Sequence, residues 1–131
     1  MDPERKVKTC PRCKDTKPVE GGFHMRGALP MGYCKVCQRE VVNDRKRLIR
    51  AENRRRADAL KRQPCMDCGR SFEPCAMDFD HRDPTTKRFD VATAVGGGMV
   101  WSRIEAEIQK CDLVCAVCHR YRTAGLHGRM V

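Results

Sequence analysis

The sequence predicts a small α+β protein that cannot fold on a hydrophobic core alone. Its 131 residues allow one or two small domains, and Leu, Ile, Val and Phe together account for only 23 of them. So low a fraction, combined with a net charge of +10, is typical of disordered chains. Ten cysteines offer another source of folding free energy, because a structural zinc ion contributes about 10–16 kcal/mol of binding energy that is also folding energy.

Eight of the cysteines form four Cys-x-x-Cys pairs. Such pairs are typical of zinc sites in a reducing compartment, so we expect zinc in preference to disulfides. Residues 1–9 are charged and lack the apolar stretch of a signal peptide, and no apolar run approaches the ~20 residues of a membrane span. We therefore expect a cytoplasmic protein without a membrane contact. Cys75 and Cys111 lie outside the pairs and are expected to be small buried side chains.

The first two pairs predict a four-cysteine zinc finger in residues 1–40. The pairs are twenty residues apart, at the edge of the spacing expected for such a site, and the Gly and Pro residues between them predict turns and short strands. We expect a closed, structural, tetrahedral site. His24 is a spare candidate ligand, although a surface histidine is the simpler interpretation. The expected ligands are Cys10, Cys13, Cys34 and Cys37.

A long basic helix is expected next, as a connector over residues 41–62. No Gly or Pro interrupts residues 36–62, and the local residues are good helix formers. Residues 35–62 hold eleven Lys or Arg and four Asp or Glu. One interpretation is a solvated connector; the one we favour is a helix that contacts a phosphate backbone. The cations proposed for that contact are Arg45, Lys46, Arg47, Arg50, Arg54, Arg55 and Arg56.

Residues 63–131 predict a second zinc-dependent module. Alternating side chains predict a half-buried strand over 76–80, and apolar residues at helical spacing predict an amphipathic helix over 101–110, with Trp101 in the core. The other expected elements are a short strand at 89–91, a glycine break at 96–98, a short strand at 113–114 and a helix over 119–123. The expected zinc ligands are Cys65, Cys68, Cys115 and Cys118.

A second kind of metal site is expected where this zinc ion brings distant residues together. One ion bound by both pairs would gather Asp80, His81 and His119 in one place. A carboxylate and an imidazole leave coordination positions open on a divalent ion, and a second imidazole can act as a base. Neighbours on a regular strand point to opposite faces, so Asp80 and His81 share a site only if the strand ends or twists at His81. Asp78, on the face of Asp80, is the reserve ligand.

This combined pattern resembles the HNH endonucleases, which have a zinc-stabilised, treble-clef-like ββα-metal fold. The resemblance covers residues 65–123 and, more loosely, residues 10–62, because a finger and a basic helix precede the nuclease module in such proteins. Several short stretches resemble small HNH proteins that are common in bacteriophages. The matching residues are Cys65-x-x-Cys68, Phe79-Asp80-His81, Lys87-Arg88-Phe89, Glu107 to Cys111, and Cys115-x-x-Cys118-His119 with Arg122-Thr123 behind it.

The resemblance implies a metal-dependent DNA endonuclease that hydrolyses or nicks phosphodiester bonds. It assigns His81 as the general base, and Asp80 and His119 as ligands of one Mg²⁺ or Mn²⁺ ion. No Asn lies between His81 and His119, and Lys110 stands where the central Asn of the family is expected, so we include Lys110 among the catalytic candidates. The implied partners are duplex DNA, a second copy in a homodimer and phage packaging proteins, in the cytoplasm of a host bacterium.

Two other functions fit the same residues. A zinc-dependent nucleic-acid-binding protein would have the same fold without catalysis, and its histidines would be satisfied polar groups beside a zinc site. A phage DNA-packaging accessory would nick DNA beside a terminase, although the sequence shows no terminase contact. We favour the endonuclease because the Asp-His and Cys-His steps occur together across matching cysteine pairs.

Overall fold

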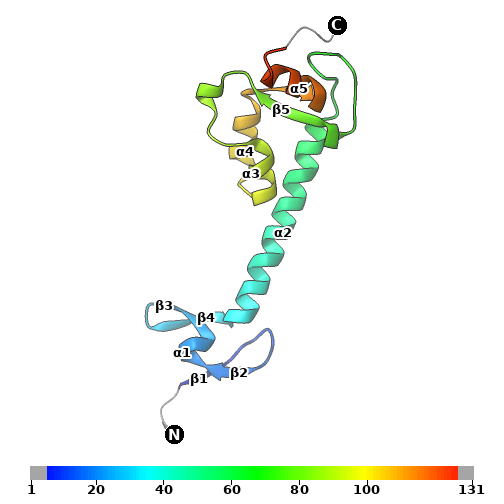
Figure 1. Cartoon of the computed structure of the whole chain (residues 1–131). Coiled ribbons are helices and arrows are strands. Elements are labelled where there is room, and N and C mark those ends of the chain that lie inside the picture. The colour runs from blue at the N-terminus through cyan, green and yellow to red at the C-terminus, as the bar shows by residue number, and fades with distance from the viewer. Residues whose placement is uncertain (1–5, 127–131) are drawn as a thin grey trace. The chain divides into compact units, whose positions relative to one another are not determined.

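The computed structural model describes residues 6–126 and divides the chain into two compact units. The N-terminal unit ends at Lys46 and the C-terminal unit begins at Arg47, so the boundary lies within the long helix α2 (Lys35–Leu60). This helix confirms a long helix here, but it begins at Lys35, six residues before the connector predicted over 41–62, and ends at Leu60. Both units combine short strands with helices, as predicted for an α+β protein (Figure 1). No helix among the described residues is both long and apolar enough to cross a membrane.

The N-terminal unit consists of two small antiparallel hairpins and the start of α2. Cysteine side chains supply most of the core that the described residues form, and the large apolar side chain of Phe23 is buried with them. The expected turns and short strands are therefore confirmed. In chain order the elements are β1 (Val7–Thr9), β2 (Thr16–Pro18), the single turn α1 (Val19–Gly22), β3 (Phe23–Arg26) and β4 (Leu29–Cys34), with β1 paired to β2 and β3 to β4.

The C-terminal unit is built around one antiparallel pair of strands, β5 (Met77–His81) and β6 (Cys111–Cys115). The register is regular over all five residues, from Met77 opposite Cys115 to His81 opposite Cys111. The remaining elements are the short 3₁₀ turns η1 (Pro74–Ala76) and η2 (Pro84–Thr86), and the helices α3 (Val91–Gly97), α4 (Trp101–Ile108) and α5 (Ala116–Thr123).

Helices α3 and α4 pack against the part of α2 that belongs to this unit (Figure 1). Ala57 of α2, Val91 and Val95 of α3 and Ile104 of α4 are buried in one cluster, and Trp101 packs against it. The prediction that Trp101 is a core residue is thus confirmed. A smaller apolar cluster surrounds the C-terminal cysteine pairs.

Three local predictions were wrong, each for a physical reason. The expected strand at 89–91 is the start of α3, because the Asp90 carboxylate caps that helix by accepting a 3.0 Å hydrogen bond from the Thr93 N–H. The glycine break is also shorter than expected, since only Gly98 is left-handed, with φ of 74°, and ends α3. Cys75 is exposed rather than buried, whereas Cys111 packs against the core.

Candidate functional site

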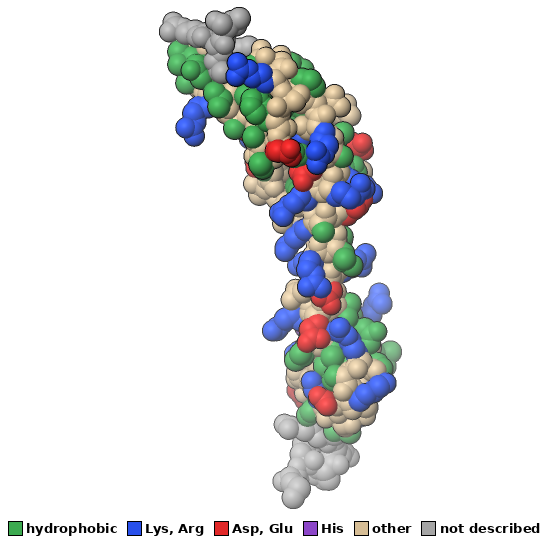
Figure 2. Space-filling model, turned by 90° about the vertical axis from the view of Figure 1, so that its right-hand side faces the viewer, with side chains coloured by type: hydrophobic (Ala, Val, Ile, Leu, Met, Phe, Trp, Pro, Cys, Tyr) green, Lys and Arg blue, Asp and Glu red, His purple; other side chains and the backbone are tan. Residues whose placement is uncertain are grey.

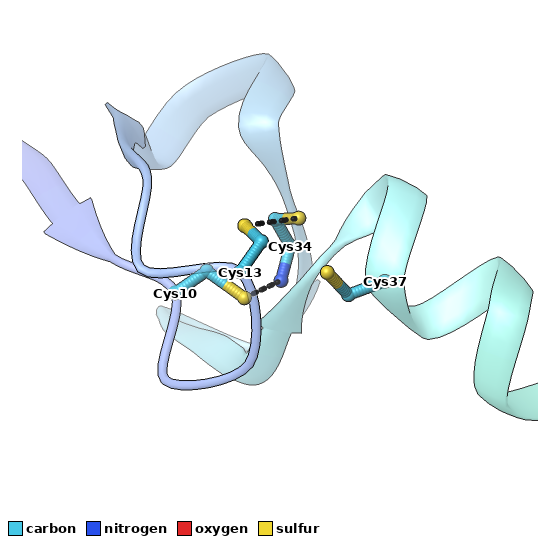
Figure 3. A group of neighbouring side chains, drawn as sticks. All are labelled: Cys10, Cys13, Cys34 and Cys37. Atoms are coloured by element: carbon cyan, nitrogen blue, oxygen red, sulfur yellow. Dashed lines mark hydrogen bonds between the residues drawn. The ribbon is translucent and has the colours of Figure 1, made fainter.

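The first four-cysteine cluster lies where β1, β4 and α2 meet. The four Sγ atoms lie within 4.8 Å of one another and point toward a common centre (Figure 3). The Cys13 and Cys34 sulfurs are 3.9 Å apart, close to the separation of about 3.8 Å that four sulfurs have at about 2.3 Å from one tetrahedral zinc ion. This arrangement could hold zinc as predicted, through Cys10, Cys13, Cys34 and Cys37.

Hydrogen bonds from N–H donors to the sulfur atoms stabilise thiolates in this cluster. The Cys34 N–H donates to the Cys10 sulfur at 3.4 Å, and the Lys17 ammonium donates to the Cys34 sulfur at 3.4 Å. Although burial opposes ionisation, backbone N–H groups lower the pKa of Cys10 to about 6, whereas burial and the neighbouring thiols raise the pKa of Cys37 to about 12. Because a thiolate is the form that binds a metal, the N–H donors favour metal binding at Cys10, and Cys37 would lose its proton on binding.

The second cluster joins residues that are fifty positions apart. The Cys115 N–H donates to the Cys65 sulfur at 3.2 Å, and the Met66 N–H donates to the Leu113 carbonyl at 2.9 Å. Cys115 ends β6 and caps α5, so one zinc ion here would tie the loop before β5 to the strand–helix junction. The four sulfurs again lie within 4.8 Å of one another, as the sequence predicts, and belong to Cys65, Cys68, Cys115 and Cys118.

Two carboxylates and one imidazole converge between β5 and α5. Asp78 and Asp80 alternate along β5 and face the helix, and His119 follows the zinc-ligand position Cys118 on α5. The His119 Nδ1 atom is 3.0 Å from Asp78 Oδ2, and its Nε2 atom is 3.4 Å from Asp80 Oδ1. The structure therefore brings Asp80 and His119 together, with the reserve ligand Asp78 beside them.

The same strand face carries further charge that the sequence reasoning did not assign. Arg122, one turn beyond His119 on α5, contacts Asp80 at 3.1 Å and Asp112 at 3.0 Å, and it forms a double hydrogen bond with Asp67 at 2.6 and 2.7 Å. Arg82 contacts Asp112 from the other side at 3.2 Å. Counting Asp78 as well, four carboxylates face two guanidinium groups.

His81 lies on the opposite face of the strand. The ladder stays regular through His81, so alternation directs this side chain toward α4. Its Nε2 atom is 2.8 Å from Glu107 Oε1, and the side chains of His81 and Glu107 are only 7% and 2% exposed. The expectation that Asp80, His81 and His119 gather in one place is thus corrected: Asp80 and His119 meet, and His81 belongs to a second cluster.

Glu107 is the centre of that second cluster. It accepts hydrogen bonds from His81, from the Arg88 N–H at 2.9 Å and from the Lys110 ammonium at 2.9 Å. Burial favours the neutral acid, but these donors outweigh it and lower the pKa of Glu107 to about 2. Lys110 also donates to the Thr86 carbonyl at 3.0 Å, so it lies with His81 and Glu107 rather than with Asp80 and His119.

The basic helix does not present its cations equally. Blue side chains project on several sides of α2 in Figure 2. Arg55 and Arg56 both bind Glu52, at 2.8 and 2.9 Å, so part of their charge is offset. Another row of cations in the C-terminal unit recurs at helical spacing along α2 and just past its end. This cation row consists of Arg47, Arg50, Arg54 and Lys61.

Comparisons with protein-family models, with curated proteins and with solved structures found no match to this chain. A function is therefore inferred from the arrangement of the residues themselves.

The structure also places the remaining predicted residues. His24, the spare ligand of the first finger, is exposed. The metal ligands of the HNH resemblance lie together, whereas its proposed base and its Lys110 lie on the other face of β5.

Proposed function

We propose that the chain is a metal-dependent DNA endonuclease of the HNH type, with its catalytic site in the C-terminal unit. The observation that supports this best is the convergence of Asp78, Asp80 and His119 between a strand and the helix that follows the second cysteine cluster. Two paired strands and a following helix beside a four-cysteine cluster are what the resemblance implies, and here β5, β6 and α5 supply them, with α3 and α4 between the strands in the chain.

The donor types are those of a hard divalent ion, which could be held by Asp80 with His119 Nε2 or by Asp78 with His119 Nδ1, because the two ring nitrogens face different carboxylates. Two carboxylates and one imidazole are ligands that Mg²⁺ or Mn²⁺ accepts while keeping positions for water and phosphate. The side chains of Asp78 and His119 are partly exposed, at 40% and 36%, so an ion from solvent could reach them. When bound, a divalent ion neutralises charge that develops on the phosphoryl and leaving oxygens. The two four-cysteine clusters offer no open position, so zinc there would be structural only.

The role proposed for His81 is the part of this proposal that a single substitution tests most directly. As the proposed base it would accept a proton from the attacking water, and its contact with Glu107 would fix the orientation of its ring. The same contact leaves Nδ1 as the ring nitrogen that is free of Glu107. In the described conformation this ring does not face Asp80 and His119. A substitution at His81 therefore changes the proposed base without changing the proposed metal ligands.

A supercoiled-plasmid assay tests the proposal. Zinc-loaded wild type, His119→Ala, His81→Ala and the control His24→Ala are each incubated with Mg²⁺, with Mn²⁺ or without a divalent ion. We expect metal-dependent conversion to open-circular or linear DNA by wild type and by His24→Ala, and a loss of at least about 100-fold in the other two variants. Cleavage by His81→Ala at the wild-type rate would remove His81 from the mechanism, and cleavage by His119→Ala would remove the metal site.

A non-catalytic, zinc-dependent nucleic-acid-binding protein is the second candidate. The observation that favours it is the burial of His81 in a hydrogen-bonded contact with Glu107, which is how a structural histidine is satisfied. This candidate predicts DNA binding by zinc-loaded protein and no plasmid conversion with any divalent ion. Conversion that depends on His119 would exclude it.

A further inference from the structure

A pocket of about 460 Å³ opens beside Asp78 and His119 in the C-terminal unit. Residues from α2, α3, β5 and α5 line it. Its volume lies within the roughly 300–1,000 Å³ of sites that hold small molecules or parts of larger ligands. Two of the metal ligands proposed above, Asp78 and His119, are among its lining residues, and the rest of the lining has no role in that proposal.

The interior of the pocket is apolar and fixed by the core. Its apolar wall is continuous with the buried cluster that joins α2, α3 and α4, so these side chains are held in place by packing on their other sides. A flat apolar group can lie against such a wall without opening the core. The apolar residues that line the pocket include Ala57, Phe79, Val91 and Val95.

Cations stand at the edge of this wall. Lys61 Nζ lies 5.5 Å from the centre of the Phe79 ring, and Arg54 has no ion pair with any residue that the structure describes. Both belong to the cation row, Arg54 on α2 and Lys61 directly after the last residue of that helix. Two of the carboxylates in the pocket already have partners, since Asp78 contacts His119 and Asp90 caps α3. A third carboxylate, Asp58, also lines the pocket, so the lining holds two cations and three carboxylates, and an anion would contact the pocket only at Arg54 and Lys61.

We propose that this pocket holds one unpaired nucleotide of the DNA substrate. Its base would lie against the Phe79 side of the apolar wall, and its phosphate would face Arg54 and Lys61. The backbone would then continue past Asp78 and His119, and the cation row would contact the neighbouring phosphates. A nucleotide combines a flat apolar ring with an anion, which is the combination that this pocket offers.

The proposal rests on the proposed function and makes its substrate more specific. A nucleotide within an intact duplex must unstack and unpair before it can enter a pocket, whereas a bulged or single-stranded nucleotide does so at little cost. We therefore infer that the chain prefers DNA with an unpaired nucleotide over a continuous duplex.

Binding to two matched probes tests the preference without cleavage. One is a 20-base-pair duplex, and the other is the same duplex with one bulged 2-aminopurine, each titrated with zinc-loaded full-length protein in the absence of Mg²⁺ and Mn²⁺. We expect about tenfold tighter binding of the bulged duplex, within the range that stacking one base provides, and a change in 2-aminopurine fluorescence on binding. Equal affinity for the two probes would overturn the proposal.

Two alanine-to-tryptophan substitutions test whether the preference for the bulged duplex depends on this pocket. Ala92 lines the pocket from the exposed side of α3, and Ala106 is an exposed alanine on α4 outside the pocket. Ala92→Trp should fill the pocket and abolish the preference for the bulge, while the affinity for the continuous duplex stays as in the wild type. The control Ala106→Trp should retain the preference. Retention of the preference by Ala92→Trp would also overturn the proposal.

These outcomes separate the pocket from the catalytic proposal. A preference that Ala92→Trp removes, in a protein that converts no plasmid, would support the pocket and reject the hydrolase. Metal-dependent conversion by a protein without any preference would support the hydrolase and reject the pocket.

Discussion

Arg122 on α5 binds both carboxylate oxygens of Asp67, at 2.6 and 2.7 Å. Asp67 lies between the first two cysteines of the second cluster, so this contact ties their loop to the helix that carries His119. The same guanidinium reaches Asp80 and Asp112 on the two paired strands. One side chain thus connects every segment that positions the candidate metal site.

Arg122→Ala should destabilise the C-terminal unit. The Arg122 side chain is 17% exposed, so its loss leaves three partly buried carboxylates without their shared cation. We expect a fall of about 2–3 kcal/mol in the free energy of unfolding, between the values for exposed and buried ion pairs. Urea unfolding measures it, with Arg120→Ala as control, because Arg120 is exposed on the same helix. Equal midpoints for the two variants would contradict the role given to Arg122.

Glu107→Gln should make stability less dependent on pH below about 5. The pKa of Glu107 is lowered to about 2, so its carboxylate contributes stability above the unfolded pKa of about 4.5 and loses it as pH falls toward 2. The stability gap between wild type and Glu107→Gln should be constant from pH 8 to about 5 and smaller at pH 4. Thermal unfolding at each pH measures the gap. A gap that widens on acidification would contradict the assignment of a low pKa.

Removal of one zinc ligand should affect one cluster only. Cys65→Ser breaks the C-terminal cluster and leaves the N-terminal four thiols intact, so native mass spectrometry should find one zinc ion in place of two. Cys75→Ser is the matched control, because Cys75 is exposed and outside both clusters. It should retain two zinc ions. A zinc count that Cys65→Ser leaves unchanged would show that this cluster does not hold zinc as a four-cysteine site.

Arg54→Gln should weaken DNA binding more than Arg55→Gln does. Arg54 belongs to the cation row and has no ion pair among the described residues, whereas Arg55 is bound by Glu52. Loss of one phosphate contact should lower the slope of log K against log salt concentration by about 0.9. Anisotropy titrations from 50 to about 200 mM salt measure the slope. Identical slopes for the two variants would contradict a contact specific to the row.

Much of the local structure could be predicted because it depends on nearby residues. The paired cysteines predicted both clusters, and the absence of Gly and Pro predicted the long helix. Alternation along β5 correctly placed Asp78 and Asp80 on one face. The same alternation places His81 on that face only if the strand ends or twists at His81. The regular ladder through His81 shows that it does not.

The rest depends on contacts between distant segments. Asp112 lies opposite Asp80 only because of the register between β5 and β6, and Arg122 reaches them only because α5 packs on that face. The contact of His81 with Glu107 likewise requires α4 to cover the other face. The alternating pattern of a single strand carries no information about which helix covers which face.

Manganese binding tests the central claim most directly. Electron paramagnetic resonance can count the Mn²⁺ ions bound to zinc-loaded wild type, Asp80→Asn, His119→Ala and the control Glu105→Gln, which changes an exposed carboxylate on α4. The account predicts one tightly bound Mn²⁺ ion in wild type and in the control, and an affinity at least about tenfold lower in the other two. Wild type without bound Mn²⁺, or Asp80→Asn and His119→Ala with unchanged affinity, would contradict a divalent-metal site formed by Asp78, Asp80 and His119.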